Sequence, residues 1–141
     1  MSNVFLKDRP QFTKCIKDID AKVLSLDDCD KIEDIFWKTF PMNNWGKVDW
    51  NKIEKKVYIG ADPEKIIPSL QKLLDINNFN KNVYIEWNDA SLHTIQTNLD
   101  SIVNNFNSLG YVAFEKFIFN TELGYIVEIR TGDDMTIGVI K

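Results

Sequence analysis

Hydrophobic residues recur every three or four positions over residues 10–19, which is the spacing of one face of an α-helix. The residues on this face are Phe12, Cys15, Ile16 and Ile19. The helical spacing stops before the run VLSL at 23–26, which favours an extended conformation. The pattern therefore predicts a helix followed by a short strand.

A second helical pattern covers residues 25–40, SLDDCDKIEDIFWKTF. Ser25 or Asp27 can cap this helix, and acidic residues fill its first turn, where the helix dipole favours negative charge. Pro41 ends the pattern because proline cannot donate the next helical hydrogen bond. The face expected to pack against the core consists of Ile32, Ile35, Phe36 and Phe40.

The middle of the chain alternates between strand and helix patterns. KKVYIG at 55–60 and NVYIEW at 82–87 are rich in β-branched and aromatic residues, so both predict strands. Between them, DPEKIIPSLQKLL at 62–74 begins with an Asp N-cap and a proline, which predicts a helix. Pro68 is expected to kink this helix or to divide it into two pieces.

The segment DASLHTIQTNLDSIVNNFNSLG at 89–110 has the pattern of one amphipathic helix. Asp89 or Ser91 can cap its start, and Gly110 suits the position just past its end. Its apolar face would consist of Leu92, Ile95, Leu99, Ile102, Val103 and Phe106.

From Gly110 onward the hydrophobic period changes from helical spacing to alternation. This predicts strands in YVAFEKFIF, GYIVEIR and MTIGVI, joined by the turn-rich segments NTEL and TGDD. In the middle strand, the face with Tyr125 and Ile129 should be buried, and the face with Glu128 and Arg130 partly exposed to water. The expected fold is α+β, with one domain over residues 1–141 and helices on a mostly antiparallel mixed sheet that ends in this three-stranded meander.

Composition agrees with an ordinary globular protein that stays in the cytoplasm. Of 141 residues, 44% are hydrophobic and 27% charged, and no apolar run approaches the roughly 20 residues of a membrane-spanning helix. Lys7, Asp8 and Arg9 interrupt the N-terminal segment, so we expect no secretory signal. Cys15 and Cys29 are too few for a disulfide framework or a zinc cluster, and are interpreted as free thiols.

Charge disfavours direct binding to nucleic acid. The net charge is −4, and net acidic segments alternate with net basic ones along the chain, whereas a duplex-binding protein needs a concentrated basic face. The sequence also has no heptad repeat of a coiled coil, so we expect the free protein to be a monomer.

Motifs of catalysis and of cofactor binding are missing from the sequence. The six glycines form no phosphate-binding loop, and no cofactor is expected. Glu86, Asp89 and the single histidine, His93, could serve a small hydrolase, but without a nucleophile or metal partner a structural role is favoured for each.

An acidic segment follows the first predicted strand and includes Asp27, Asp28, Asp30, Glu33 and Asp34. It lacks the glycine of a calcium-binding EF-hand loop, so a metal site is not expected. Two interpretations stay open: a solvated first helical turn, or a surface that recognises a basic partner.

Three segments together resemble one protein family. They are the WGxxDW-like element at 45–50, WNDASL at 87–92 leading into the predicted helix, and the C-terminal hairpin that ends in MTIGVI. This order resembles the immunity proteins of bacterial contact-dependent growth inhibition systems, which neutralise the toxic C-terminal domain of a cell-surface effector. The resemblance spans nearly the whole chain, and none of its segments carries catalytic chemistry.

The resemblance implies a structural role for Trp45, Gly46, Asp49 and Trp50. Both indoles are expected to be buried and Asp49 to cap or hydrogen-bond the turn that follows. The competing interpretation leaves one tryptophan in solvent as an anchor for a partner, because tryptophan is enriched in binding hot spots.

The implied partner is a cognate toxin domain, frequently a nuclease in this family, bound one to one. An acidic inhibitor can imitate the charge of a nuclease substrate. The residues expected to bind it are Asp27, Asp28, Asp30, Glu33 and Asp34, with Asp133 and Asp134 as a second candidate. The alternatives are an α+β adaptor that binds a protein through residues 43–52, which contain Trp45 and Trp50 and which we call the Trp segment, and the hydrolase above.

Overall fold

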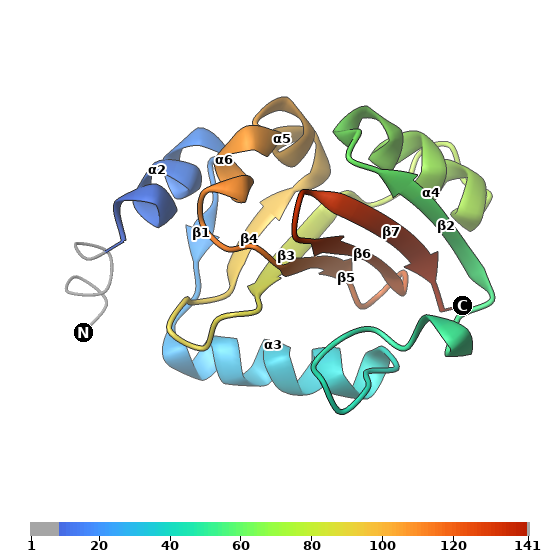
Figure 1. The fold of residues 1–141 in the computed structure, drawn as a ribbon, viewed down its shortest axis with the longest axis horizontal. Helices are drawn as coiled ribbons and strands as arrows, with labels where there is room; N and C mark the ends of the chain where they lie inside the picture. The colour runs from blue at the N-terminus through green and yellow to red at the C-terminus, as the bar shows by residue number, and fades with distance from the viewer. Residues whose placement is uncertain (1–8, 141) are drawn as a thin grey trace.

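The computed structural model describes residues 9–140, and these form one sheet with helices on both of its faces (Figure 1). Lys7 and Asp8, on which the expectation about a secretory signal depends, lie outside the described residues. Each strand pairs antiparallel with its neighbours, in the order β1-β4-β3-β5-β6-β7-β2. The strands are β1 Lys22–Val23, β2 Lys55–Gly60, β3 Asn82–Trp87, β4 Ile95–Asn98, β5 Lys116–Asn120, β6 Tyr125–Arg130 and β7 Asp134–Val139.

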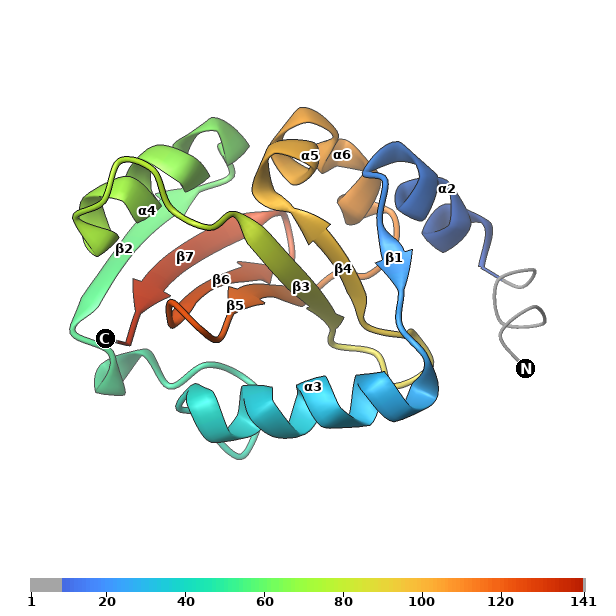
Figure 2. The ribbon, with the colours of Figure 1, turned by 180° about the vertical axis from the view of Figure 1, so that it is seen from behind.

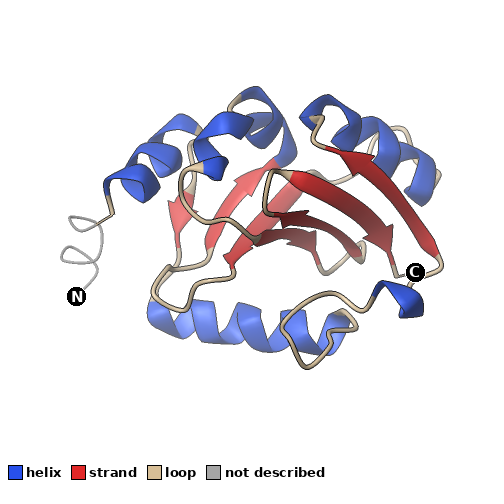
Figure 3. Ribbon diagram, in the orientation of Figure 1, coloured by secondary structure: helices blue, strands red, loops and turns tan. Residues whose placement is uncertain are grey.

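Helices cover the two faces of the sheet unequally. Figure 1 shows α3 alone along one face and the other α-helices together on the opposite face, and the secondary-structure colouring of Figure 3 separates these layers. The view from behind in Figure 2 shows β1 and β2 at the two edges of the sheet. The helices are α2 Pro10–Asp18, α3 Leu26–Thr39, α4 Ile66–Leu74, α5 Leu99–Asn104 and α6 Phe106–Gly110, with short 3₁₀ turns η1 Trp50–Lys52 and η2 Pro63–Lys65. The predicted α+β class and the C-terminal meander are therefore confirmed.

Two hydrophobic cores, one on each face, explain why the sheet contains so many apolar residues. Tyr125, Val127 and Ile129 of β6 belong to the larger core, together with residues of α2, α4, α5 and α6. Ile126, on the opposite face of β6, packs into a second core beneath α3. The expectation that this face would be partly exposed is wrong for Ile126 and Glu128, which are both buried because α3 and the Trp segment cover them.

The local signals for α3 are confirmed. Ser25 is its N-cap, and the Ser25 hydroxyl accepts a hydrogen bond of 3.2 Å from the backbone N–H of Asp28. Phe36 anchors the buried face, with its ring centroid 4.7 Å from that of Phe119 and 5.3 Å from that of Phe117. Ile35, which we expected on the buried face, is exposed. The face of α3 that packs against the sheet is narrower than the hydrophobic spacing predicts.

The helix predicted over 62–74 is divided into two pieces, η2 and α4. Asp62 caps η2, since its carboxylate accepts a hydrogen bond of 3.0 Å from the N–H of Glu64. Pro68 lies in the first turn of α4, where no intrahelical N–H is required. A continuous α-helix from Pro63 would need Pro68 to donate to Glu64, which proline cannot do.

The single helix predicted over 89–110 is wrong. Residues 89–94 form a loop, Ile95–Asn98 form β4 between β1 and β3, and two short helices follow. Ile95 and Thr97 are buried on one face of the sheet, so the alternating period prevails over the helical one in this stretch. Asn98 then caps α5, with its side-chain oxygen 3.0 Å from the N–H of Ser101.

Candidate functional site

The residues suggested for a hydrolase each have a structural partner. Glu86 accepts a hydrogen bond of 2.7 Å from the hydroxyl of Thr94. Asp89 accepts from both the N–H and the hydroxyl of Ser91, at 2.9 and 2.6 Å, and so shapes the loop after β3. Nδ1 of His93 lies 2.8 Å from the carbonyl oxygen of Leu24. His93 is therefore a loop residue and not the helix residue that we expected.

Of the two carboxyl groups, that of Glu86 has the larger pKa shift. Burial raises the pKa of Glu86 to about 7, the hydrogen bond from Thr94 opposes the shift, and the charge of Glu33 on α3 adds to it. A perturbed carboxyl group can serve acid–base chemistry. The carboxyl group of Glu86 instead accepts a hydrogen bond from Thr94. This contact joins β3 to the loop before β4 and stabilises the fold.

Neither a metal centre nor a membrane segment is found in the described part of the chain. Within residues 9–140, no three His, Cys, Asp or Glu side chains come together in a way that could hold a metal ion. No helix in the same range has the length and the apolar character needed to cross a bilayer.

The acidic residues of α3 form an exposed surface. All five predicted positions on this helix are exposed, and Asp34 makes an ion pair of 2.8 Å with Lys38 one turn later. The larger core lies on the other side of the sheet. The acids of α3 therefore face solvent on the side of the molecule that this single helix covers.

Asp133 and Asp134 belong to a different part of the surface. Asp133 borders Gly110 of α6, on the opposite face of the sheet from α3: a Cβ on Gly110 would lie 3.5 Å from Oδ1 of Asp133. The carboxylate of Asp134 accepts hydrogen bonds from Tyr58 and from Arg130, and these two contacts, in that order, hold the pKa of Asp134 below its ordinary value. The two predicted acidic groups are thus not brought together by the fold.

The Trp segment closes the second core. Met42 and Val48 form an isolated β-bridge, and Val48 is buried beneath the sheet. The indole N–H of Trp50 donates a hydrogen bond of 2.9 Å to Glu128, and Trp50 packs against the second core while staying partly exposed. Asp49 occupies the N-cap position of η1 without a side-chain capping bond, and its carboxylate lies 3.8 Å from Nζ of Lys52.

Trp45 is not buried, and this expectation is wrong: its side chain is 85% exposed. The side-chain oxygen of Asn43 accepts hydrogen bonds from the N–H groups of Trp45 and Lys47, at 2.9 and 3.1 Å. Gly46 has a φ of 73°, a left-handed conformation that glycine adopts readily in such a tight turn. The Trp segment therefore combines one packed and one exposed tryptophan.

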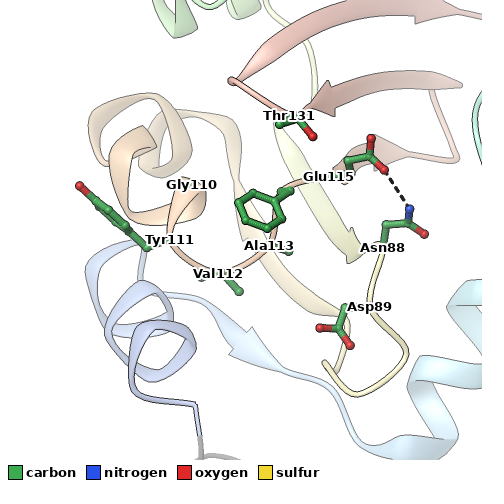
Figure 4. A pocket seen from close by; sticks show the side chains of 9 residues that line it. Asn88, Asp89, Gly110, Tyr111, Val112, Ala113, Glu115 and Thr131 are labelled. Carbon is green, nitrogen blue, oxygen red and sulfur yellow. Dashed lines mark hydrogen bonds between the residues drawn. The ribbon is translucent and has the colours of Figure 1, made fainter.

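A second exposed aromatic segment lies at residues 111–115, between α6 and β5 (Figure 4). It adjoins the loop after β3, where Nδ2 of Asn88 donates to Oε1 of Glu115 at 3.3 Å, the contact dashed in Figure 4. An open hollow of about 640 Å³ lies between these segments and Thr131. Figure 4 shows Asp89 beside the same hollow, and Tyr111 with its ring directed away from the other side chains drawn.

The exposure of Tyr111 and Phe114 is not expected from the sequence, because the pattern over 111–119 predicts a strand, whereas β5 begins only at Lys116. A possible signal was the pair Glu115 and Lys116, since two consecutive charges interrupt the alternation expected of a strand with one buried face. Lys116 itself is buried, and burial lowers the pKa of its amine, whereas nearby Asp133 raises it.

Comparison of the sequence with known protein families gives a match that covers most of the chain. A sequence profile described as CdiI immunity protein EcoliA0-like matches residues 10–138, which is nearly the whole described chain. Among curated proteins, none matches the sequence. The match includes the Trp segment, the loop after β3 and the C-terminal meander, which are the segments that carried the resemblance. The chain therefore belongs to the CdiI immunity protein EcoliA0-like family.

Proposed function

We propose that this protein is a non-enzymatic inhibitor that binds, one to one and in the cytoplasm, the toxin domain of a contact-dependent growth inhibition effector. The family match over residues 10–138 is the observation that carries the proposal. The contacts of Glu86, Asp89 and His93 agree with it, because each has a structural partner within the fold.

The toxin domain in this proposal is a nuclease. A nuclease must hold a phosphodiester backbone and therefore presents a cationic site. The chain carries a net charge of −4 and exposes a row of carboxylates on α3, and these attract such a site electrostatically. The acidic residues proposed to recognise the toxin are Asp27, Asp28, Asp30, Glu33 and Asp34 on α3, with Asp133 in the turn between β6 and β7 and Asp134 at the start of β7.

The proposal predicts that the gene of a large surface effector directly precedes the gene of this chain, and the test uses the C-terminal domain of that effector. The two proteins are co-expressed, purified, and examined by light scattering for a one-to-one complex. The purified domain is then assayed for cleavage of RNA and DNA with and without the chain. We expect a stable complex and loss of cleavage. A domain that cleaves equally well in the presence of excess chain would contradict the proposal.

A further inference from the structure

Three aromatic side chains are the most exposed large hydrophobic residues of the described chain. Trp45 is 85% exposed, Phe114 79% and Tyr111 76%. Burying an aromatic ring removes a large apolar area from water. Three such rings exposed in one region are therefore typical of a surface that another molecule covers. They come from two segments far apart in the sequence, 43–47 and 111–115.

Contacts between polar side chains join these two segments. Nζ of Lys47 makes an ion pair with Glu115, which also accepts the hydrogen bond from Asn88. A Cβ on Gly46 would lie 4.0 Å from Oδ1 of Asn88, so the turn at Trp45 lies against the loop after β3. The three aromatics therefore belong to one continuous region of the surface, which we call the aromatic edge: residues 43–47, 88–89, 111–115 and 131–133.

Buried polar contacts hold the aromatic edge in place. The ammonium group of Lys116, a residue only 1% exposed, donates hydrogen bonds of 2.8 Å to the carbonyl of Ala113 and 3.1 Å to that of Leu109. The carbonyl of Leu109 precedes the segment that presents Tyr111 and Phe114, and the carbonyl of Ala113 lies within it. Because its backbone is already fixed, this segment loses less conformational entropy when a partner binds. Preorganised binding surfaces share this property.

One hollow of the aromatic edge has the composition of a site for a cation. It measures about 340 Å³, and Tyr111, Phe114 and Asp133 line it together with Gly110 and Thr131. No lysine or arginine lines this hollow. Aromatic faces attract a guanidinium or ammonium group, and a carboxylate beside them adds charge-assisted hydrogen bonds.

We propose that the aromatic edge holds the toxin domain, and that an arginine or lysine side chain of that domain enters the hollow between Tyr111, Phe114 and Asp133. This inference rests on the proposed function and adds the contact surface to it. Trp45 contacts the partner beside the hollow. The acids of α3, on the other face of the sheet, attract the cationic partner over a distance and do not hold it.

A second copy of this chain fits the aromatic edge less well than a basic partner. Each copy carries a net charge of −4, and the hollow would face the same acidic surface in the other copy. Like charges brought together at an interface cost several kcal/mol. Light scattering on the free chain at high concentration, with wild type and Phe114→Ala compared, examines this alternative directly.

The deciding experiment measures the dissociation rate of the complex with the toxin domain by surface plasmon resonance. We expect Phe114→Ala, Trp45→Ala and Asp133→Asn each to raise this rate about tenfold. Asp133 has a φ of 61°, which asparagine tolerates, so the turn is kept. Asp75→Asn is the matched control, because Asp75 also has a positive φ, 56°, and is exposed elsewhere. Trp37→Ala is the control for an exposed indole on α3.

The outcomes separate this inference from the proposed function. Phe114→Ala combined with Asp133→Asn should raise the dissociation rate by less than the product of the two single fold-changes, because both side chains hold the same cation. If the wild type binds tightly and all three variants dissociate at its rate, the aromatic edge is not the contact surface, although the proposed function stands. Self-association that Phe114→Ala abolishes would overturn the inference in favour of a homodimer. A wild type that fails to bind contradicts the proposed function itself.

Discussion

The indole N–H of Trp50 donates a hydrogen bond of 2.9 Å to Oε1 of Glu128, a residue of β6 that is only 4% exposed. The other carboxylate oxygen, Oε2, accepts from the backbone N–H of Val48, also at 2.9 Å. Arg130 adds a third donor at 3.0 Å. One buried carboxylate thus fastens the Trp segment beneath the sheet, and it explains how a polar-looking segment can accommodate a packed tryptophan.

Removing this carboxylate should destabilise the fold. In Glu128→Gln, an amide N–H₂ replaces one oxygen and faces a donor, so either Val48 or Trp50 loses its acceptor. Because Val48 is buried and Trp50 is partly buried, we expect the free energy of unfolding to fall by about 2 kcal/mol. Urea unfolding followed by circular dichroism measures the change. Glu54→Gln, at an exposed position, is the control and should stay close to wild type.

Because Gly138 of β7 has no side chain, the indole of Trp50 can lie directly against it. A Cβ at this position would lie 2.6 Å from Cζ3 of Trp50 and 3.1 Å from Cγ2 of Ile53. Gly138→Ala should therefore lower the free energy of unfolding by about 2 kcal/mol through overpacking. In a Trp50→Phe background the smaller ring leaves room, so the same alanine should cost clearly less. An equal cost in both backgrounds would show that the clash is not with this indole.

Much of the fold could be predicted because its elements carry strong local signals. Ser25 before an acidic first turn marks the start of α3, and the β-branched and aromatic runs mark β2, β3 and β6. These signals depend only on neighbouring residues. The second face of β6 could not be predicted in the same way, since its burial depends on a helix and a loop that are distant in sequence.

The failure over 89–110 has a physical cause. Ile95 and Leu99 fit a helical period, but Ile95 and Thr97 also fit a strand, and the two patterns compete over a short stretch. Pairing of β4 with both β3 and β1 decides in favour of the strand. Such pairing is a tertiary effect, and intrinsic propensity does not reveal it.

The candidate site was only partly accessible from the sequence. The acids of α3 are exposed, as a capped helix with an acidic first turn suggests. Trp45 and Phe114 could not be assigned to one surface, because the contacts that join their segments run through Lys47, Glu115 and Asn88. No spacing rule relates residues this far apart along the chain.

The acids of α3 should affect the rate of association with the toxin domain more than the rate of dissociation. Combined Asp27→Asn, Asp28→Asn and Asp30→Asn removes three exposed charges. Since such charges act by electrostatic steering, we expect association about five times slower at low salt and a weaker dependence on ionic strength. Surface plasmon resonance at several salt concentrations measures both rates. A large rise in the dissociation rate, with Phe114→Ala unchanged, would instead place the contact on α3.

Glu86 should make the stability of the fold depend on pH. Burial raises its pKa from the ordinary value of 4.5 to about 7. The folded protein therefore holds this proton more tightly than the unfolded chain does. The resulting stability is fully present below about pH 4.5 and is lost as the pH rises through about 7. Glu86→Gln keeps an oxygen that can accept from Thr94 but carries no charge, so it removes this dependence.

We expect the free energy of unfolding of the wild type to fall, relative to Glu86→Gln, by about 2 kcal/mol between pH 5 and pH 8. Urea unfolding of both proteins at each pH measures this difference, and comparing them cancels the titration of the other groups. Glu64→Gln is a suitable control, because Glu64 is exposed. A difference between wild type and Glu86→Gln that stays constant from pH 5 to pH 8 would mean that Glu86 is charged in the folded protein throughout, with water or a neighbouring cation offsetting its burial.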